Sequence, residues 1–173
     1  MVQPGDVIEN PVTGERITFV RTSAQTGGGL AEMDLELRPG AFLAAEHIHL
    51  HQEERFEVLD GRIRLRFGGE ESVRGRGEVA VVPAGSPHAW APDGRGGARV
   101  RLTFTPGADI EEFFDEFFRC AREGRTNAKG MPSPLVTARL GLTHHMYLSG
   151  PAVPLQRVAF RVLVGAAQLL HRG

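Results

Sequence analysis

The sequence lacks several features that would assign it to a whole class of proteins. It contains one cysteine, Cys120, so it cannot form an intramolecular disulfide, and we expect a reducing, cytoplasmic environment. Its 20 basic and 21 acidic residues leave a net charge of −1, which predicts no nucleic-acid partner. The first residues form no charged and apolar leader, and an uninterrupted run of about 18 apolar residues is missing. We therefore expect neither a secretory signal nor a membrane-spanning helix.

The sequence has the pattern of one β domain followed by a C-terminal extension. From about residue 6 to residue 105, short runs of alternating apolar and polar residues are separated by turn residues. The clearest run is 31–38, in which every second residue from Ala31 to Leu37 is apolar. Other strands are expected at 16–21, 54–59, 62–67, 78–82 and 99–105, with a turn at Asp60-Gly61. Many short strands at this spacing predict a sandwich or a small barrel.

Two short blocks of the sequence carry residues that can bind a metal ion. His47 and His49 stand two positions apart, so on a strand both imidazoles point to the same side. Glu54 follows on the next strand, and His88 comes from a distant hairpin. Three neutral imidazoles and one carboxylate suit Fe, Ni, Zn, Mn or Cu. We therefore predict one inward-facing site for a divalent transition metal ion.

Two neighbouring residues leave the ligand set open. His51 has the same parity as His47 and His49, so a regular strand would point it inward too, whereas a turn after His49 would remove it. Glu53 adjoins Glu54 and could support the site from behind or lie in solvent.

The two blocks resemble the two motifs of the cupin superfamily. The first runs from Gly40 through the histidine pair to Gly61, and the second from Gly77 to His88. The family's carboxylate ligand has the six-residue spacing to glycine that Glu54 has, which favours Glu54 over Glu53. The sequence departs from the common pattern at Pro92, where the family often has asparagine, and in the distance from Gly40 to the first histidine. The resemblance implies a mainly β fold, a double-stranded β-helix (jelly-roll-like) barrel over residues 1–106.

Strand parity also predicts which residues lie beside the metal ion. Phe56 and Val58 follow Glu54 at even spacing, and Trp90 follows His88 at the same spacing. All three are candidates for a substrate pocket. An indole ring such as that of Trp90 can stack on a flat apolar ligand, or it can belong to the core.

The hydrophobic period changes near residue 107 to that of a helix. Asp109 and Glu112 have the spacing of a capping box, and Phe113, Phe114, Phe117 and Phe118 follow on one stripe. Further helices are expected at about 134–147 and 154–170. We predict a helical extension over residues 107–173 that packs on the barrel or on the partner in a homodimer. The basic stripe of the last helix, with Arg157 and Arg161, would also suit contact with a membrane surface.

The predicted site leads to three functional hypotheses. The resemblance implies that such a site with Fe or Ni belongs to dioxygenases acting on small aromatic or enolic molecules. With Zn or Mn, the same ligands suit a redox-neutral isomerase or cyclase. A third hypothesis is a protein that binds a small ligand without turnover. We predict the dioxygenase, with Glu54 as the catalytic carboxylate.

Overall fold

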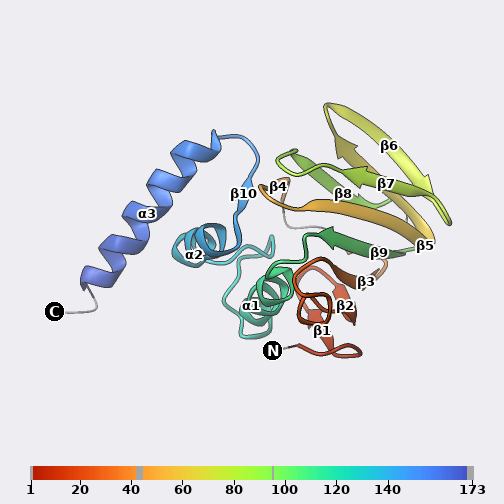
Figure 1. Cartoon of the computed structure of the whole chain (residues 1–173), viewed down its shortest axis with the longest axis horizontal. Helices are drawn as coiled ribbons and strands as arrows, with labels where there is room; N and C mark the ends of the chain where they lie inside the picture. The colour runs from red at the N-terminus through yellow and green to blue at the C-terminus, as the bar shows by residue number, and fades with distance from the viewer. Residues whose placement is uncertain (1, 42–44, 95, 171–173) are drawn as a thin grey trace.

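The computed structural model describes residues 2–41, 45–94 and 96–170. In this part of the chain, nine strands are followed by two helices, a tenth strand and a third helix (Figure 1). The strands are β1 (Val7–Asn10), β2 (Glu15–Arg21), β3 (Ala31–Leu37), β4 (His47–His49), β5 (Glu53–Phe67), β6 (Glu70–Gly75), β7 (Val79–Val82), β8 (His88–Pro92), β9 (Ala98–Thr105) and β10 (Met146–Leu148). The helices are α1 (Ile110–Arg122), α2 (Pro134–His144) and α3 (Val153–Leu170), and a 3-10 turn spans Ala24–Thr26. The predicted fold class, a mainly β barrel with C-terminal helices, is confirmed.

The core consists of side chains from the inner face of the sheet, joined by buried side chains of α1 and α2. The strand order is β1-β2-β3-β9-β5-β8-β4-β10, with β6 and β7 each paired to β5. Strand β3 is the clearest case, because every second residue from Ala31 to Leu37 is buried. Leu35 lies opposite Ile17 on β2 and opposite Val100 on β9, so apolar side chains meet on one face. The alternation that predicted this strand therefore also identifies which of its side chains face the core.

Strand β5 runs through Asp60-Gly61, where we predicted a turn between two strands. Residues 53–61 of β5 pair with β9, and residues 63–67 pair with β8. The pairing with β9 shifts register between Val58 and Asp60, which marks a β-bulge. The predicted turn is wrong: Asp60 and Gly61 stay paired with Arg99 and Ala98 on β9, and Gly61 adopts its left-handed φ of 72° within the strand. A single strand, β5, therefore pairs with β9 along its first part and with β8 along its second part.

Replacing Gly61 with alanine is expected to destabilise the protein by roughly 2 kcal/mol or more. A Cβ atom at this position would lie 2.6 Å from the carbonyl oxygen of Gly97, in addition to the strain of a positive φ. Gly68→Ala is the matched control, because Gly68 also has a positive φ of 63° but nothing lies within 4 Å of its Cβ position. Urea unfolding measures both losses, and equal losses would contradict the close contact with Gly97.

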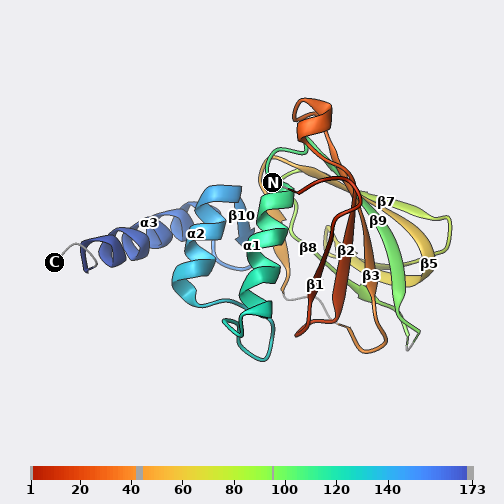
Figure 2. The same ribbon diagram turned by 90° about the horizontal axis from the view of Figure 1, so that it is seen from below.

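Helix α1 places its phenylalanine stripe against the barrel. It lies beside β1, with α2 and then α3 farther out (Figure 2). Phe113 and Phe118 are buried, and the ring of Phe114 lies 6.1 Å from that of Phe104 on β9. The predicted capping box does not form, because the Asp109 carboxylate accepts a hydrogen bond from Nδ1 of His144 at 2.8 Å instead of capping the helix.

The second predicted helix is shorter than expected and is followed by a strand. It ends at His144, because His145 adopts a left-handed conformation with φ of 54°. Met146–Leu148 then form β10, which pairs with β4 so that Leu148 lies opposite His47. The helical extension therefore adds a strand directly beside the predicted metal ligands.

Helix α3 packs on α2 and against β10. Phe160 lies close against Gly141 and stacks on Tyr147, with ring centroids 6.0 Å apart. The far face is exposed and apolar, as its most exposed residues show: Leu155, Val158, Val162, Leu169 and Leu170. On length and composition alone, with a mean hydropathy of 1.2, Val153–Leu170 could cross a membrane, although arginines interrupt its apolar run. Docking on a partner subunit, the other arrangement expected from the sequence, stays a prediction.

Candidate metal centre

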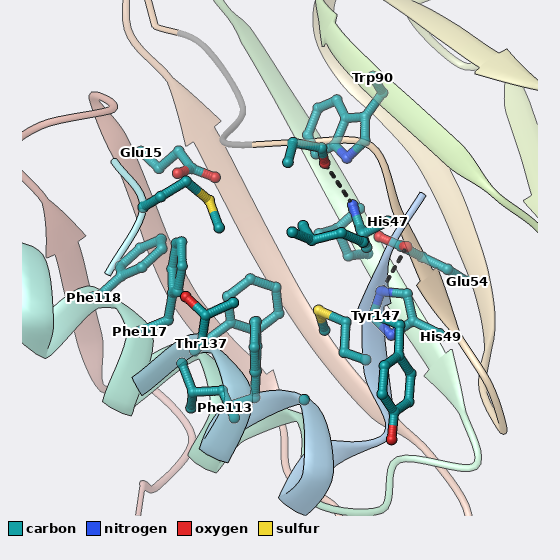
Figure 3. A pocket seen from close by; sticks show the side chains of 18 of the residues that line it. Glu15, His47, His49, Glu54, Trp90, Phe113, Phe117, Phe118, Thr137 and Tyr147 are labelled. Carbon is teal, nitrogen blue, oxygen red and sulfur yellow. Dashed lines mark hydrogen bonds and ion pairs between the residues drawn. The ribbon is translucent and has the colours of Figure 1, made fainter. Parts of the chain in front are cut away.

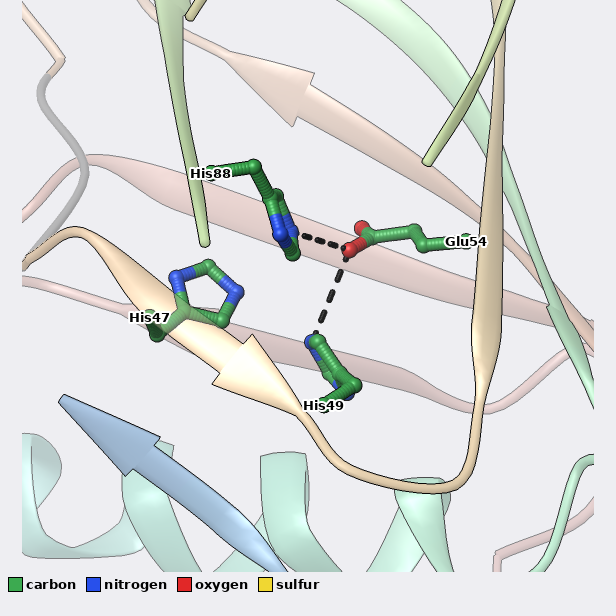
Figure 4. Close-up of side chains that lie close together, drawn as sticks. All are labelled: His47, His49, Glu54 and His88. Atoms are coloured by element: carbon green, nitrogen blue, oxygen red, sulfur yellow. Dashed lines mark hydrogen bonds and ion pairs between the residues drawn. The ribbon is translucent and has the colours of Figure 1, made fainter. Parts of the chain in front are cut away.

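Four side chains that were predicted as metal ligands converge inside the barrel. His47 and His49 lie on β4, Glu54 near the start of β5 and His88 at the start of β8. His47 is the register partner of His88, and their ring centroids are 4.5 Å apart. One ligand atom from each of the four residues lies within 4.8 Å of the others (Figure 4). Neighbouring strands therefore bring the two sequence blocks into one site.

Two of the imidazoles are oriented by backbone carbonyl groups. Nδ1 of His47 lies 2.9 Å from the carbonyl oxygen of Ala45, and Nδ1 of His88 lies 3.0 Å from that of Ser86. Since a carbonyl oxygen only accepts hydrogen bonds, Nδ1 carries the hydrogen in both rings. The Nε2 atom of each ring is therefore the one available to a metal ion.

The third imidazole is oriented by a glutamine that sequence reasoning missed. Nε2 of Gln52 donates to the carbonyl oxygens of Pro106 and Gly107, at 3.2 and 2.9 Å. This fixes the amide so that its Oε1 accepts from Nδ1 of His49 at 3.2 Å. His49 thus also offers Nε2 to the site. No motif carries this signal; only the position of Gln52 between two predicted ligands could have suggested it.

The carboxylate of Glu54 is hydrogen bonded to the imidazole of His88. Its Oε2 lies 2.8 Å from Nε2 of His88 and 3.5 Å from Nε2 of His49. Because Nδ1 of His88 already donates to a carbonyl group, the short contact requires Nε2 to donate as well. Burial opposes the charged form of His88, but the hydrogen bond and charge of Glu54 outweigh burial and raise the pKa of His88. A proton therefore bridges two groups that would both turn toward a cation.

The electrostatics of the other groups also suit a cation. Burial opposes the charged form of Glu54, but the hydrogen bond from His88 and the neighbouring imidazoles outweigh it and lower the pKa of Glu54. For His47 and His49 the largest effect is burial, which lowers the pKa of both imidazoles and keeps these rings neutral. Two neutral imidazoles, one imidazole that can release its proton and one carboxylate fit a divalent transition metal ion.

The two alternatives, His51 and Glu53, lie apart from the four clustered side chains. His51 is exposed, and its ring lies 4.9 Å from that of His145. Strand β4 ends at His49, so the strand parity that would have turned His51 inward no longer applies. Glu53 is exposed on the outer side of β5 and lies outside the cluster.

An apolar cavity adjoins the cluster (Figure 3). It encloses about 120 Å³, close to the roughly 150 Å³ of a protein cavity that holds one benzene molecule. Trp90 lines it and packs edge-on against Phe56 at 5.4 Å between centroids. Phe56 and Val58 point inward into the core and are not among the residues that line this cavity, so their role in a substrate pocket stays a prediction. The opposite wall comes from the helical extension: Phe113, Phe114, Phe117, Phe118, Thr137, Leu140, Gly141, Met146, Tyr147, Leu148 and Phe160.

Replacing Gln52 with leucine is expected to weaken metal binding by about ten- to a hundredfold. The variant loses the hydrogen bond that selects the Nδ1–H form of His49 and leaves the carbonyl groups of residues 106 and 107 without their donor. Competition with a chelator dye measures the affinity. Gln3→Leu, at an exposed position near the N-terminus, is the control; equal affinities in both variants would contradict a role for Gln52 in the site.

Comparison with known proteins supports the sequence resemblance. Residues 33–106 match the family model described as the cupin domain. The quercetin 2,3-dioxygenase of Bacillus subtilis (strain 168) is 29% identical over 82 residues, which cover 47% of this chain and 24% of that protein. The chain thus spans about a quarter of the length of this curated relative.

Solved structures share the fold. The structure of KdgF from Halomonas sp. has a TM-score of 0.52 at 20% identity and covers 61% of this chain and 90% of that one. An RmlC-like cupin from Shewanella frigidimarina has a TM-score of 0.51 at 16% identity, with 62% and 88% covered. Identities this low show the fold alone. Together these findings confirm the resemblance and the fold that it implied.

Proposed function

Because residues 33–106 of this chain form a cupin domain, we propose that the protein is a metal-dependent dioxygenase acting on a small aromatic or enolic molecule. One observation carries the proposal: three of the four clustered side chains, His47, His49 and Glu54, form part of the wall of an apolar cavity that is rich in aromatic side chains. The fold alone does not select a reaction, so the site has to do so.

The residues of the cluster would hold the ion through Nε2 of the three histidines and a carboxylate oxygen of Glu54. A bound Fe or Ni ion would supply the redox chemistry that a reaction with O2 needs, as well as Lewis acidity. Glu54 is the one carboxylate of the cluster and can accept the proton of an enol or phenol that enters the cavity. The ring of Trp90, held edge-on by Phe56, offers a flat surface to an aromatic ligand.

The helical extension contributes to the proposed chemistry by keeping water out. The phenylalanine rings of α1 cover the side of the cavity that the barrel leaves open, and Phe113 and Phe118 are buried there. A dry, apolar site strengthens the interaction of Glu54 with a bound hydroxyl group. The volume of about 120 Å³ favours single-ring substrates.

The name of the Bacillus subtilis relative supports the same class, since it is a dioxygenase of an aromatic compound. The match covers a quarter of that protein, so its substrate is not carried over to this chain.

The test is elemental analysis of protein purified without chelator or metal-affinity resin, followed by O2-uptake assays with catechols, flavonols and diketones. We expect stoichiometric Fe, Ni or Cu, and O2 consumption in step with consumption of a single-ring substrate. Turnover without O2 in protein that contains Zn or Mn would instead indicate an isomerase or cyclase. Binding of small ligands without turnover in any metal form would leave a binding protein.

A further inference from the structure

A second carboxyl group, that of Glu15, lines the same cavity away from the metal ligands. Glu15 is the first residue of β2 and shares the inner face of that strand with Ile17 and Phe19. Its side chain is 5% exposed, and Figure 3 shows it across the cavity from His47. A carboxyl group in apolar surroundings costs free energy unless it is hydrogen bonded or used. The proposed metal centre makes no use of it.

The hydrogen bonds of Glu15 leave one carboxyl oxygen available to a ligand. The hydroxyl group of Thr13, itself buried, donates to Oε2 at 2.5 Å. Within residues 2–41, 45–94 and 96–170, no other side chain forms a hydrogen bond or ion pair with Glu15. The remaining oxygen, Oε1, therefore has hydrogen-bonding capacity that the protein does not satisfy.

The other groups around the cavity do not compensate a charge on Glu15. The titratable side chains in its wall are His47 and His49 on β4, Glu54 on β5 and Tyr147 on β10. The walls from β3, β8, β9, α1, α2 and α3 offer apolar side chains, the indole N–H of Trp90 and the hydroxyl group of Thr137, none of which carries a charge. Burial raises the pKa of Glu15 to about 7, and the hydrogen bond from Thr13 opposes that rise only in part. Near neutral pH, Oε1 thus either donates a proton or accepts one.

We propose that Glu15 is the polar anchor of this cavity and selects small single-ring ligands that carry a hydroxyl group. This hydroxyl group binds Glu15, while the opposite side of the ring faces the metal ligands. A hydroxyl group fits because it can both accept from the neutral carboxyl group and donate to the carboxylate. A ligand with a carboxylate at this end would be repelled by the ionised form of Glu15. The orientation of the ligand rests on the proposed function; the anchor itself does not, because it involves no metal ligand.

The test compares two probes that differ only in this hydroxyl group, 4-(hydroxymethyl)catechol and 4-methylcatechol. Their affinities are measured by titration calorimetry without oxygen, on Zn-loaded and on chelator-treated protein. The variants are Glu15→Leu, which removes the anchor, and Glu15→Gln, which keeps one donor and one acceptor. Glu53→Gln, on the exposed side of β5, is the control. Zinc content is determined for every sample.

We expect the wild-type protein to prefer the hydroxymethyl probe by about tenfold, the effect of one well-placed buried hydrogen bond. Glu15→Leu should lose this preference with unchanged zinc content, and Glu15→Gln should retain most of it. The same preference in wild type and Glu15→Leu, or no binding of either probe, would overturn the anchor. Failure to bind zinc would overturn the proposed metal centre, while the probe preference of the chelator-treated protein would still decide on Glu15.

Discussion

Replacing His47 and His49 together with alanine is expected to abolish metal binding while the barrel stays folded. The two residues supply two of the four clustered side chains that could hold the ion. Four-ligand zinc sites bind with roughly 10–16 kcal/mol, so an even share per ligand predicts a loss of about 5–8 kcal/mol. That corresponds to at least about a thousandfold lower affinity, enough to leave the purified variant without metal. Elemental analysis beside the wild-type protein measures the effect.

The matched control for this variant is His51→Ala. His51 is two residues from His49 and has the same strand parity, but it lies outside the cluster and is exposed. Its replacement should leave the metal content at the wild-type level. Far-UV circular dichroism of both variants tests whether the barrel has formed. A double variant that keeps its metal would show that the ion binds elsewhere, and a His51→Ala variant that loses its metal would reopen the ligand set.

The convergence of the four side chains could be predicted from spacing and strand alternation, together with the resemblance to cupins that favoured Glu54 over Glu53. His47 and His49 share one side of a three-residue strand, and the register places His88 directly opposite His47. The same rule correctly turned Phe56 inward but did not place it in the cavity. Parity gives the side of a sheet, whereas the position along the barrel axis decides whether a side chain meets the core or a ligand.

Other features of the site depend on contacts between segments that are distant in the sequence. Gln52 orients His49 only because the end of β9 brings two carbonyl groups to its amide, 54 and 55 residues away. The cavity has its outer wall only because the helices fold back on the barrel, and the period of a helix does not reveal which surface it covers. Glu15 was within reach of sequence reasoning, since it alternates with Ile17 and Phe19. Starting the predicted strand at residue 16 left it out.

Replacing Glu15 with glutamine is expected to raise the free energy of unfolding by about 3 kcal/mol at pH 8, and by less than about 1 kcal/mol at pH 5. The ordinary pKa of the carboxyl group is 4.5, and burial raises it to about 7 in the folded protein. Between these values, the folded chain keeps a proton that the unfolded chain has released. The wild-type protein therefore loses stability as the pH rises from 4.5 to 7, with no further loss from this group above that range.

Glutamine has a similar shape and does not titrate, so the advantage of the variant should grow through the same pH range and then stay constant. Urea unfolding at pH 5, 6, 7 and 8 measures it, and the metal ligands contribute equally to both proteins because the substitution leaves them in place. Glu53→Gln, at an exposed position, controls for the loss of one negative charge. Parallel stability curves for the wild type and Glu15→Gln would contradict a buried, proton-binding Glu15. A separation confined to pH values above 5 would show that the protein keeps a costly carboxyl group in its cavity, which is expected of a group retained for binding a ligand.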